Sequence, residues 1–410
     1  MTKMIKLSLA AAVAVSALTT SATAGSLGDA IKDTTISGKA LIGYNYKEVS
    51  TAGVKTSSNQ TEYDIDVTLN TKVNDTITFT TGIEADHDLD NRDDSTDAGK
   101  NDEIGLTKLY FTAKTDVATV MIGKQKQPTP FLDDNRGDGV VALIPAGPVT
   151  IAAGHFTGMN GGQSIAKGDA INLNLSQRDI SALAVIATAG PVNVQAWYVT
   201  ASDAGSDVNA DLTDPTAGGT ATNTLEQGLD AYSVNLSGKF GPVNVELNHA
   251  SAKLDAAAGV SFDKETLTKL IVSSKVADVN LVAGYGFTND NTTDSRNHGV
   301  DLTNDDDAKT NFRLDQIVLD TYNDADAILL GASMTFGQTT VGANYLMATV
   351  GATAADAKID ATELDLTVKY AMSKNFSITG LYSTANYDFN TAGTVDNDDD
   401  RMELSLNYKF

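Results

Sequence analysis

The chain of 410 residues carries 53 acidic and 29 basic residues, a formal net charge of −24, and contains no cysteine. So acidic a chain is unsuited to nucleic acid or to an anionic membrane surface, and it favours cations, divalent ones included. A large sheet needs no disulfides, so the lack of cysteine does not argue against an exported protein.

The N-terminus has the pattern of a secretory signal peptide. Two lysines precede an apolar core, Leu7 to Leu18, and Ala22-Thr23-Ala24 is an A-x-A cleavage site. The apolar run is too short to span a bilayer of about 30 Å, which argues against a membrane-anchor helix. We therefore predict that residues 1–24 are a cleaved signal peptide and that residues 25–410 form a single domain. The cleaved chain would hold 27 Lys+Arg against 53 Asp+Glu, a formal charge of −26.

Apolar and polar residues alternate from residue 35 to the C-terminus with the period of two that is typical of strands. The second segment is the clearest, because Tyr63, Ile65 and Val67 alternate with acids. We predict strands at 35–48, 61–73, 76–88, 103–114, 117–126, 138–145, 149–157, 179–188, 192–201, 229–239, 243–253, 265–276, 279–288, 325–336, 339–349, 362–371, 375–388 and 400–410. Residues 138–145 and 179–188 are apolar on both faces, so sixteen strands remain an alternative to eighteen, and the number should be even.

Short turns and long polar loops alternate along the chain; between the first two strands we expect a polar loop of Thr, Ser, Gly and Asn. Gly-Pro-Val recurs at 147–149, 190–192 and 241–243, and Ala277-Asp278 and Gly337-Gln338 take the same place in later strand pairs. Proline suits the first residue of a strand, where its missing N–H does no harm. Short periplasmic turns and long external loops are typical of outer-membrane barrels.

The last nine residues, Met402 to Phe410, alternate strictly and end on an aromatic ring. In an outer-membrane barrel the apolar face of such a strand would meet lipid, its polar face would meet a wet lumen, and the ring would lie at the membrane boundary. The sequence therefore predicts an all-β fold, a transmembrane antiparallel up-and-down β-barrel of about 18 strands, with short periplasmic turns and long acidic external loops.

Aromatic residues near the strand ends predict two girdles. Phe240 and Phe336 precede short turns, and Phe156, Tyr198, Phe287 and Tyr387 lie near long-loop ends.

The long loops hold many of the acids, in the stretches Asp86 to Glu103, Asn289 to Asp326 and Asp396 to Asp400. A solvated outer surface is one interpretation. The other is that clustered carboxylates bind a divalent cation such as calcium. No loop matches the EF-hand pattern, so no metal ligands are assigned.

Residues 124–139, between the predicted fifth and sixth strands, form the candidate pore constriction. Two prolines stiffen this loop, and charges of both signs crowd it. Folded into the water-filled lumen of a barrel of about 16 to 18 strands, it would set the pore width and its charges would set selectivity. An ordinary external loop is the alternative. The candidate constriction residues are Lys108, from the polar face of an earlier strand, and Lys124, Lys126, Asp133, Asp134, Arg136 and Asp138.

An enzyme is not expected. The four histidines, His87, His155, His249 and His298, are dispersed along the chain. The chain has no G-x-S-x-G, no H-E-x-x-H and no Gly-rich phosphate-binding loop. We predict no catalytic residue and no required cofactor.

Several short pieces of the chain share an order with a known family. They are Lys6-Leu-Ser-Leu, Ala30-Ile-Lys-Asp, Ser37-Gly38, Leu109-Tyr-Phe-Thr, the stretch from Ala118 to Gln125, and Tyr408-Lys-Phe. With these pieces the chain resembles the major outer membrane protein (porin) family of campylobacters and related epsilonproteobacteria. The resemblance implies an eighteen-stranded, trimeric, cation-preferring porin in which the loop after the fifth strand constricts the pore.

Together these patterns indicate a passive diffusion channel for small hydrophilic solutes, with a moderate preference for cations, in the cell outer membrane. The alternative is a surface structural or adhesin-type barrel whose loops bind an external partner. The expected partners are outer-membrane lipid and lipopolysaccharide, small hydrophilic solutes and ions, and further copies of the chain in a homotrimer.

Overall fold

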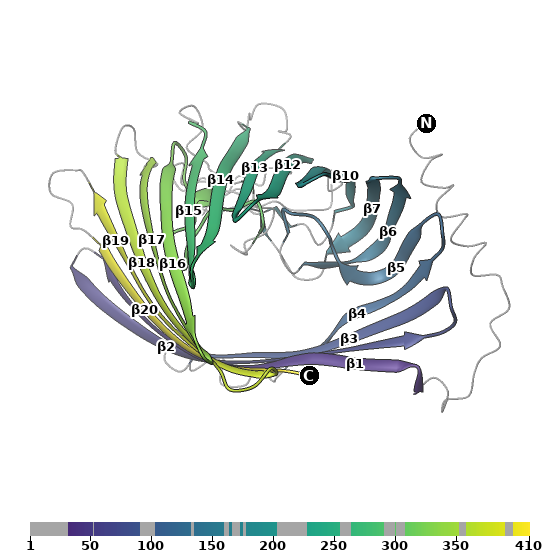
Figure 1. The fold of residues 1–410 in the computed structure, drawn as a ribbon, viewed down its shortest axis with the longest axis horizontal. Helices are drawn as coiled ribbons and strands as arrows, with labels where there is room; N and C mark the ends of the chain where they lie inside the picture. The colour runs from purple at the N-terminus through teal and green to yellow at the C-terminus, as the bar shows by residue number, and fades with distance from the viewer. Residues whose placement is uncertain are drawn as a thin grey trace, which may run out of the picture.

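A computed structural model describes most of the chain and shows one closed antiparallel sheet of eighteen strands (Figure 1). The described residues are 32–51, 53–90, 103–132, 135–159, 164–165, 173–174, 178–202, 228–254, 264–290, 300, 308–351, 358–389 and 397–410. The predicted signal peptide, residues 1–24, lies outside them. Among these residues, none belongs to a helix with the length and apolar character needed to cross a membrane.

The eighteen strands follow one another around the barrel in chain order. They are β1 (Thr34–Thr51), β2 (Val54–Lys72), β3 (Ile77–Asp90), β4 (Glu103–Lys114), β5 (Thr119–Lys126), β6 (Arg136–Ala146), β7 (Val149–Met159), β10 (Ile180–Ala189), β11 (Val192–Ala201), β12 (Leu229–Phe240), β13 (Val243–Leu254), β14 (Glu265–Val276), β15 (Val279–Thr288), β16 (Asp326–Phe336), β17 (Thr339–Gly351), β18 (Lys358–Ala371), β19 (Phe376–Phe389) and β20 (Asn397–Lys409). Outside this sheet, β8 (Ser164–Ile165) pairs with β9 (Leu173–Asn174), and η2 (Leu319–Thr321) is one turn of 3-10 helix.

The barrel closes where β1 pairs with both β2 and β20. The β1–β20 register runs from Lys39 opposite Lys409 to Val49 opposite Asp399. Beyond it, Gly38 and Phe410 exchange two backbone hydrogen bonds of 2.9 and 3.0 Å. A Cβ at Gly38 would lie 2.6 Å from the Phe410 ring, so glycine is required for the ring to lie over this seam.

The predicted alternation is confirmed, and the count is eighteen rather than sixteen. The segments predicted at 138–145 and 179–188 are β6 and β10. Large apolar side chains such as Ile65, Leu330 and Val368 are exposed on the outer face, while their polar neighbours along each strand face inward. Because the barrel closes on itself, each of its strands has a hydrogen-bonded neighbour on both sides.

The prediction of a polar loop between the first two strands is wrong. β1 continues to Thr51 and β2 begins at Val54, so a tight turn at Gly53 joins them. The register remains continuous through this region, and Lys55 forms an ion pair with Glu48 at 2.6 Å. Polar residues on both faces suit a hairpin that continues into water, and apolar alternation alone does not reveal it.

The aromatic girdles are confirmed in part. Tyr198, Phe287, Phe240 and Phe336 are exposed on the outer face. Phe156 is only 1% exposed and Tyr387 lines an inner cavity, so these two rings belong to the interior. Position near a strand end does not say which face a ring is on, because one residue of register reverses it.

The short turns follow the predicted repeat. Gly147, Gly190, Gly241 and Gly337 each have a φ near +60° at the first turn position. That conformation suits a type II′ hairpin turn, in which glycine takes the first central position. Ala277 takes the same place with a φ of 53° and is strained there, because a Cβ disfavours the left-handed region.

Replacing Ala277 by glycine should therefore stabilise the barrel by about 1 kcal/mol. The matched control is Gly337→Ala, which should destabilise it by a similar amount, since nothing lies within 4 Å of the added Cβ and only backbone strain changes. Urea unfolding of the protein in lipid vesicles measures both free energies. Equal stability of the Ala277→Gly variant and the parent would show that the backbone at Ala277 is not strained.

Candidate functional site

Residues 127–132 and 135, from the connection between β5 and β6, fold into the barrel interior. The Phe131 side chain is fully buried, in an apolar cluster that includes Phe156 of β7 and Trp197 of β11. An external loop would leave this ring in water, and burying it stabilises the folded loop by about 2 kcal/mol. We call residues 127–132 and 135 the first inner segment.

A second connection also lies in the interior, between β15 and β16. We call residues 308–325 the second inner segment. Phe312, Ile317 and Leu319 are almost fully buried in the same cluster as Phe131. Burial raises the pKa of the Tyr322 hydroxyl, so this phenol stays neutral at physiological pH.

The two inner segments touch each other, and the second rests on a strand that has space for it. The Thr310 N–H donates to the Pro130 carbonyl at 3.3 Å. The Phe312 ring lies over two inward-facing glycines of β15. A Cβ at Gly284 would lie 2.9 Å from Cε2 of this ring, and one at Gly286 would lie 2.7 Å from Cγ. Side chains at these two positions would displace the ring and with it the segment.

Lys269 of β14 holds the start of the second inner segment. Its Nζ donates to the carbonyls of Lys309 and Asn311, at 2.7 and 2.8 Å. The Lys269 side chain is buried, so these bonds satisfy a cation that has little access to water.

Glu363 of β18 holds the middle of the same segment. One carboxylate oxygen accepts the N–H of Gln316 and the other accepts the N–H of Ile317, both at 2.7 Å. The Ser383 hydroxyl donates to the same carboxylate at 3.1 Å. Glu363 has no solvent exposure, so these short hydrogen bonds replace its hydration.

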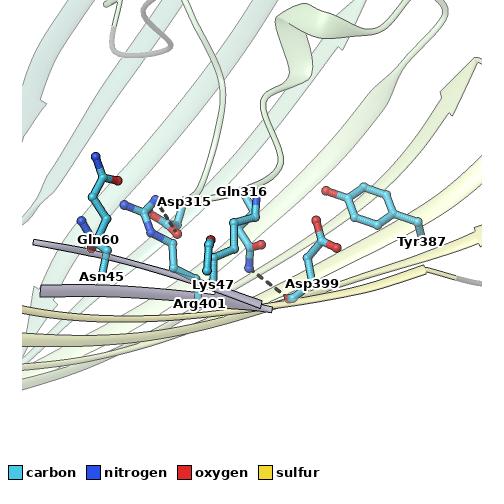
Figure 2. Close-up of a pocket in the computed structure, with 9 residues that line it drawn as sticks. Asn45, Lys47, Gln60, Asp315, Gln316, Tyr387, Asp399 and Arg401 are labelled. Carbon is cyan, nitrogen blue, oxygen red and sulfur yellow. Dashed lines mark hydrogen bonds and ion pairs between the residues drawn. The ribbon is translucent and has the colours of Figure 1, made fainter. Parts of the chain in front are cut away.

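Two further contacts join the segment to β20, and Figure 2 shows both reaching the wall near the seam. Nη1 of Arg401 lies 3.0 and 3.2 Å from the two Asp315 oxygens. The Gln316 amide donates to the Ser383 hydroxyl at 2.9 Å and to the Asp399 carbonyl at 3.2 Å. The segment therefore lies along the inner wall from β14 to β20 and narrows the lumen.

Ion pairs line the inner wall of the first strands. They join Lys39 to Asp64, Lys108 to Asp66 at 3.2 Å, and Arg136 to Glu84 at 2.9 Å. Lys108 also donates to the Thr68 hydroxyl at 2.9 Å. Opposite charges are thus interleaved across β1 to β6, and neither sign forms an unbroken stripe.

The structure brings some of the predicted constriction residues together and separates others. Lys108 and Lys126 line one inner cavity. Arg136 pairs with Glu84 on the wall. Lys124 and Asp138 are opposite each other in the β5–β6 register and line none of the inner cavities described below. Asp133 and Asp134 lie outside the described residues.

Three water-accessible cavities border the inner segments. Two of about 420 Å³ each share Pro130, Gln195, Trp197 and Lys309 as lining residues, so they form one continuous groove beside the point where the segments touch. The third, of about 310 Å³, lies between the second inner segment and the strands at the seam. The inner segments thus have cavities on both sides.

Sequence reasoning missed the second inner segment, because the stretch from residue 289 to 326 was interpreted as an acidic external loop. A local signal was present: Phe312, Ile317, Val318 and Leu319 are apolar residues in an otherwise polar loop. A loop that remains in water does not need such a group, so their clustering indicates burial.

Calcium binding by the acidic loops remains a prediction. Within the described ranges, no group of three or more His, Asp or Glu side chains is arranged to hold a metal ion. The loop acids at 91–102, 301–307 and 396 lie outside those ranges.

Similarity to known proteins agrees with this geometry. No curated protein matches the chain. Among solved structures, Pseudomonas aeruginosa OpdQ aligns with a TM-score of 0.64 at 12% identity, covering 93% of this chain and 100% of that one. P. aeruginosa OpdL aligns at 0.68 and 11%, and OccK2 (OpdF) in complex with glucuronate at 0.63 and 14%, each covering 92% of this chain and 99% of its own.

At these identities the solved structures show the fold, an eighteen-stranded barrel shared with outer-membrane porins. The model of the family described as Campylobacter major outer membrane protein matches residues 2–410, essentially the whole chain. The closed barrel, the polar lumen and the inner segments fit a channel rather than an enzyme. The chain therefore belongs to the Campylobacter major outer membrane protein family and is a porin of the outer membrane.

Proposed function

We propose that this porin passes small hydrophilic solutes and ions by passive diffusion with a moderate preference for cations. The two inner segments and the facing wall of β1, β2 and β20 would form the selective region. Solutes would cross without a chemical step, so pore width and charge alone determine which ones pass.

The observation that carries this proposal is the pairing of the wall bases. Lys39, Lys108 and Arg136 each have a carboxylate partner, so their positive charge is largely cancelled within the lumen. With the signal peptide removed the chain carries a formal −26. An excess of acid around a lumen in which these three bases are neutralised favours cations, and the low-dielectric wall focuses that field into the pore.

Reversal potentials in a KCl gradient test the preference. The parent should select K⁺ over Cl⁻. Replacing Asp66 by Asn together with Glu84 by Gln leaves Lys108 and Arg136 without these partners, and should lower the K⁺/Cl⁻ permeability ratio by about twofold or more, because charges within a Debye length of the path dominate selectivity.

The matched control is Asp75→Asn with Asp278→Asn, which removes the same charge from two short turns at the far end of the barrel. That variant should keep the parent ratio. An equal effect of both pairs would mean that total charge, and not the wall, sets selectivity. We also expect Asp133, Asp134 and Asp138, changed together to Asn, to shift the ratio toward anions.

We further propose a homotrimer, as the resemblance to trimeric porins implies. Such an interface would use flat apolar outer faces, of which the barrel has many. Cross-linking of the protein in native outer membranes should yield a trimer band, and an exclusively monomeric product would contradict the assembly.

A further inference from the structure

The cavity of about 310 Å³ beside the seam combines features that recognise a particular kind of solute. It lies between the second inner segment and the wall of β1, β2, β19 and β20 (Figure 2). Asn45, Lys47 and Gln60 line it from one side, and Gln316 and Asp399 from the other. The cavity is hydrated and predominantly polar, and it lies within the selective region proposed above.

The cavity holds one cation and one anion that are not paired with each other. Arg401 is engaged by Asp315. Lys47 and Asp399, in contrast, form no ion pair with any residue that the structure describes, although the Asp399 carboxylate accepts the Ser50 backbone N–H. Lys47 is opposite Arg401 in the β1–β20 register, so Asp399 is its diagonal neighbour on β20. The backbone positions of such diagonal neighbours are about 7 to 8 Å apart.

Two amide oxygens at the same cavity are also without hydrogen-bond donors. The Asn45 Oδ1 and Gln316 Oε1 atoms are buried and have no partner in the described part of the chain. A buried acceptor without a donor costs free energy, which a ligand that supplies N–H groups would recover. An ammonium carries three such donors.

These groups together match an ammonium and a carboxylate on one small molecule. Asp399, Asn45 and Gln316 would accept the ammonium protons, and Lys47 would hold the carboxylate. We propose that this cavity is a binding subsite for zwitterionic solutes, namely free amino acids or very short peptides. The inference deepens the proposed function, on which it rests, by naming a solute class for this part of the pore.

A net-neutral zwitterion suits this location for a second reason. An anion approaching the lumen is opposed by the overall acidity of the chain, whereas a zwitterion has no net charge to repel. Its ammonium and carboxylate still interact with Asp399 and Lys47, because two charges in contact are separated by less than a Debye length of about 8 Å.

Single-channel recording with L-alanine tests the subsite. Lactamide is the matched solute, since it has the same number of heavy atoms but no charge. Added alanine should interrupt the KCl current in a concentration-dependent way, and lactamide should not. The Lys47→Gln/Asp399→Asn variant should weaken the alanine response by about five- to tenfold, as expected for the loss of two partly exposed ion pairs.

The control variant is Lys72→Gln/Asp75→Asn, which removes an exposed ion pair of the same composition at a short turn. It should respond to alanine like the parent. No alanine response in a parent that conducts KCl, or a full response in Lys47→Gln/Asp399→Asn, would overturn the subsite. The proposed function would fail separately, through the absence of cation preference in the KCl gradient alone.

Discussion

Deletion of Tyr408, Lys409 and Phe410 should leave protease-sensitive protein in the periplasm and almost none in the outer membrane. The Lys409 N–H donates to the Asn375 carbonyl at 2.8 Å, and Phe410 exchanges two backbone bonds with Gly38. Without these residues the end of β1 loses its partner strand. Each backbone group left unpaired in lipid costs several kcal/mol, so the barrel cannot close favourably.

A second variant separates the contribution of the backbone hydrogen bonds from that of the Tyr408 and Phe410 rings, whose centroids lie 5.8 Å apart at the seam. Tyr408→Ala with Phe410→Ala keeps every backbone bond and should assemble in reduced but measurable amounts. Protease digestion of fractionated cells and heat-dependent migration on gels report the folded fraction. Normal levels of folded, truncated protein in the outer membrane would show that closure does not depend on these residues.

Replacing Glu363 by alanine should increase single-channel conductance and current noise. The change removes the carboxylate that accepts the Gln316 and Ile317 N–H groups and leaves both donors unpaired. Each buried donor left unpaired costs about 1 to 3 kcal/mol. A loss of about 3 kcal/mol shifts the equilibrium between attached and detached segment by roughly a hundredfold.

The segment should detach only locally, around residues 315–317, because Lys269 and the Phe312 ring still hold its start. Glu363→Gln keeps the side-chain volume with a single acceptor oxygen and should give an intermediate conductance. The control is Glu246→Gln, an inner-wall acid whose Oε1 accepts the Asn235 amide and which forms no hydrogen bond with the second inner segment in the described part of the chain. If Glu363→Ala and Glu246→Gln behave alike while both migrate as folded barrels, Glu363 does not restrain the pore.

The strands were predictable because their signal is local. Each residue of a barrel strand faces either lipid or the lumen, so apolar and polar residues tend to alternate one by one. The segments that became β6 and β10 are apolar on both faces and depart from this pattern, which left their prediction the weakest. The Gly-Pro turns were predictable for a similar reason, since a φ near +60° admits few residues other than glycine.

The candidate site was predictable only in outline. Residues 124–139 stood out by their prolines and mixed charges, and Lys108 by its place on a polar face. The acids that pair with Lys108 and Arg136, and the acid that holds the second inner segment, did not stand out. Asp66, Glu84 and Glu363 come from strands far away in sequence and are ordinary acids when taken alone. Spacing along the chain carries no information on which strands a curved sheet brings together across its lumen.

By itself the sequence determined that this protein is a closed outer-membrane barrel, that it ends on its own closing strand, and that it is strongly acidic. Those properties depend on local alternation, on turn chemistry and on composition. Only the tertiary structure decided which connections enter the lumen and what holds them there. The space that Gly284 and Gly286 leave for the Phe312 ring exists only once distant strands are side by side. The same holds for the hydrogen bonds from two backbone N–H groups to the Glu363 carboxylate. A loop's destination is set by contacts with such strands, and no pattern within the loop can specify them.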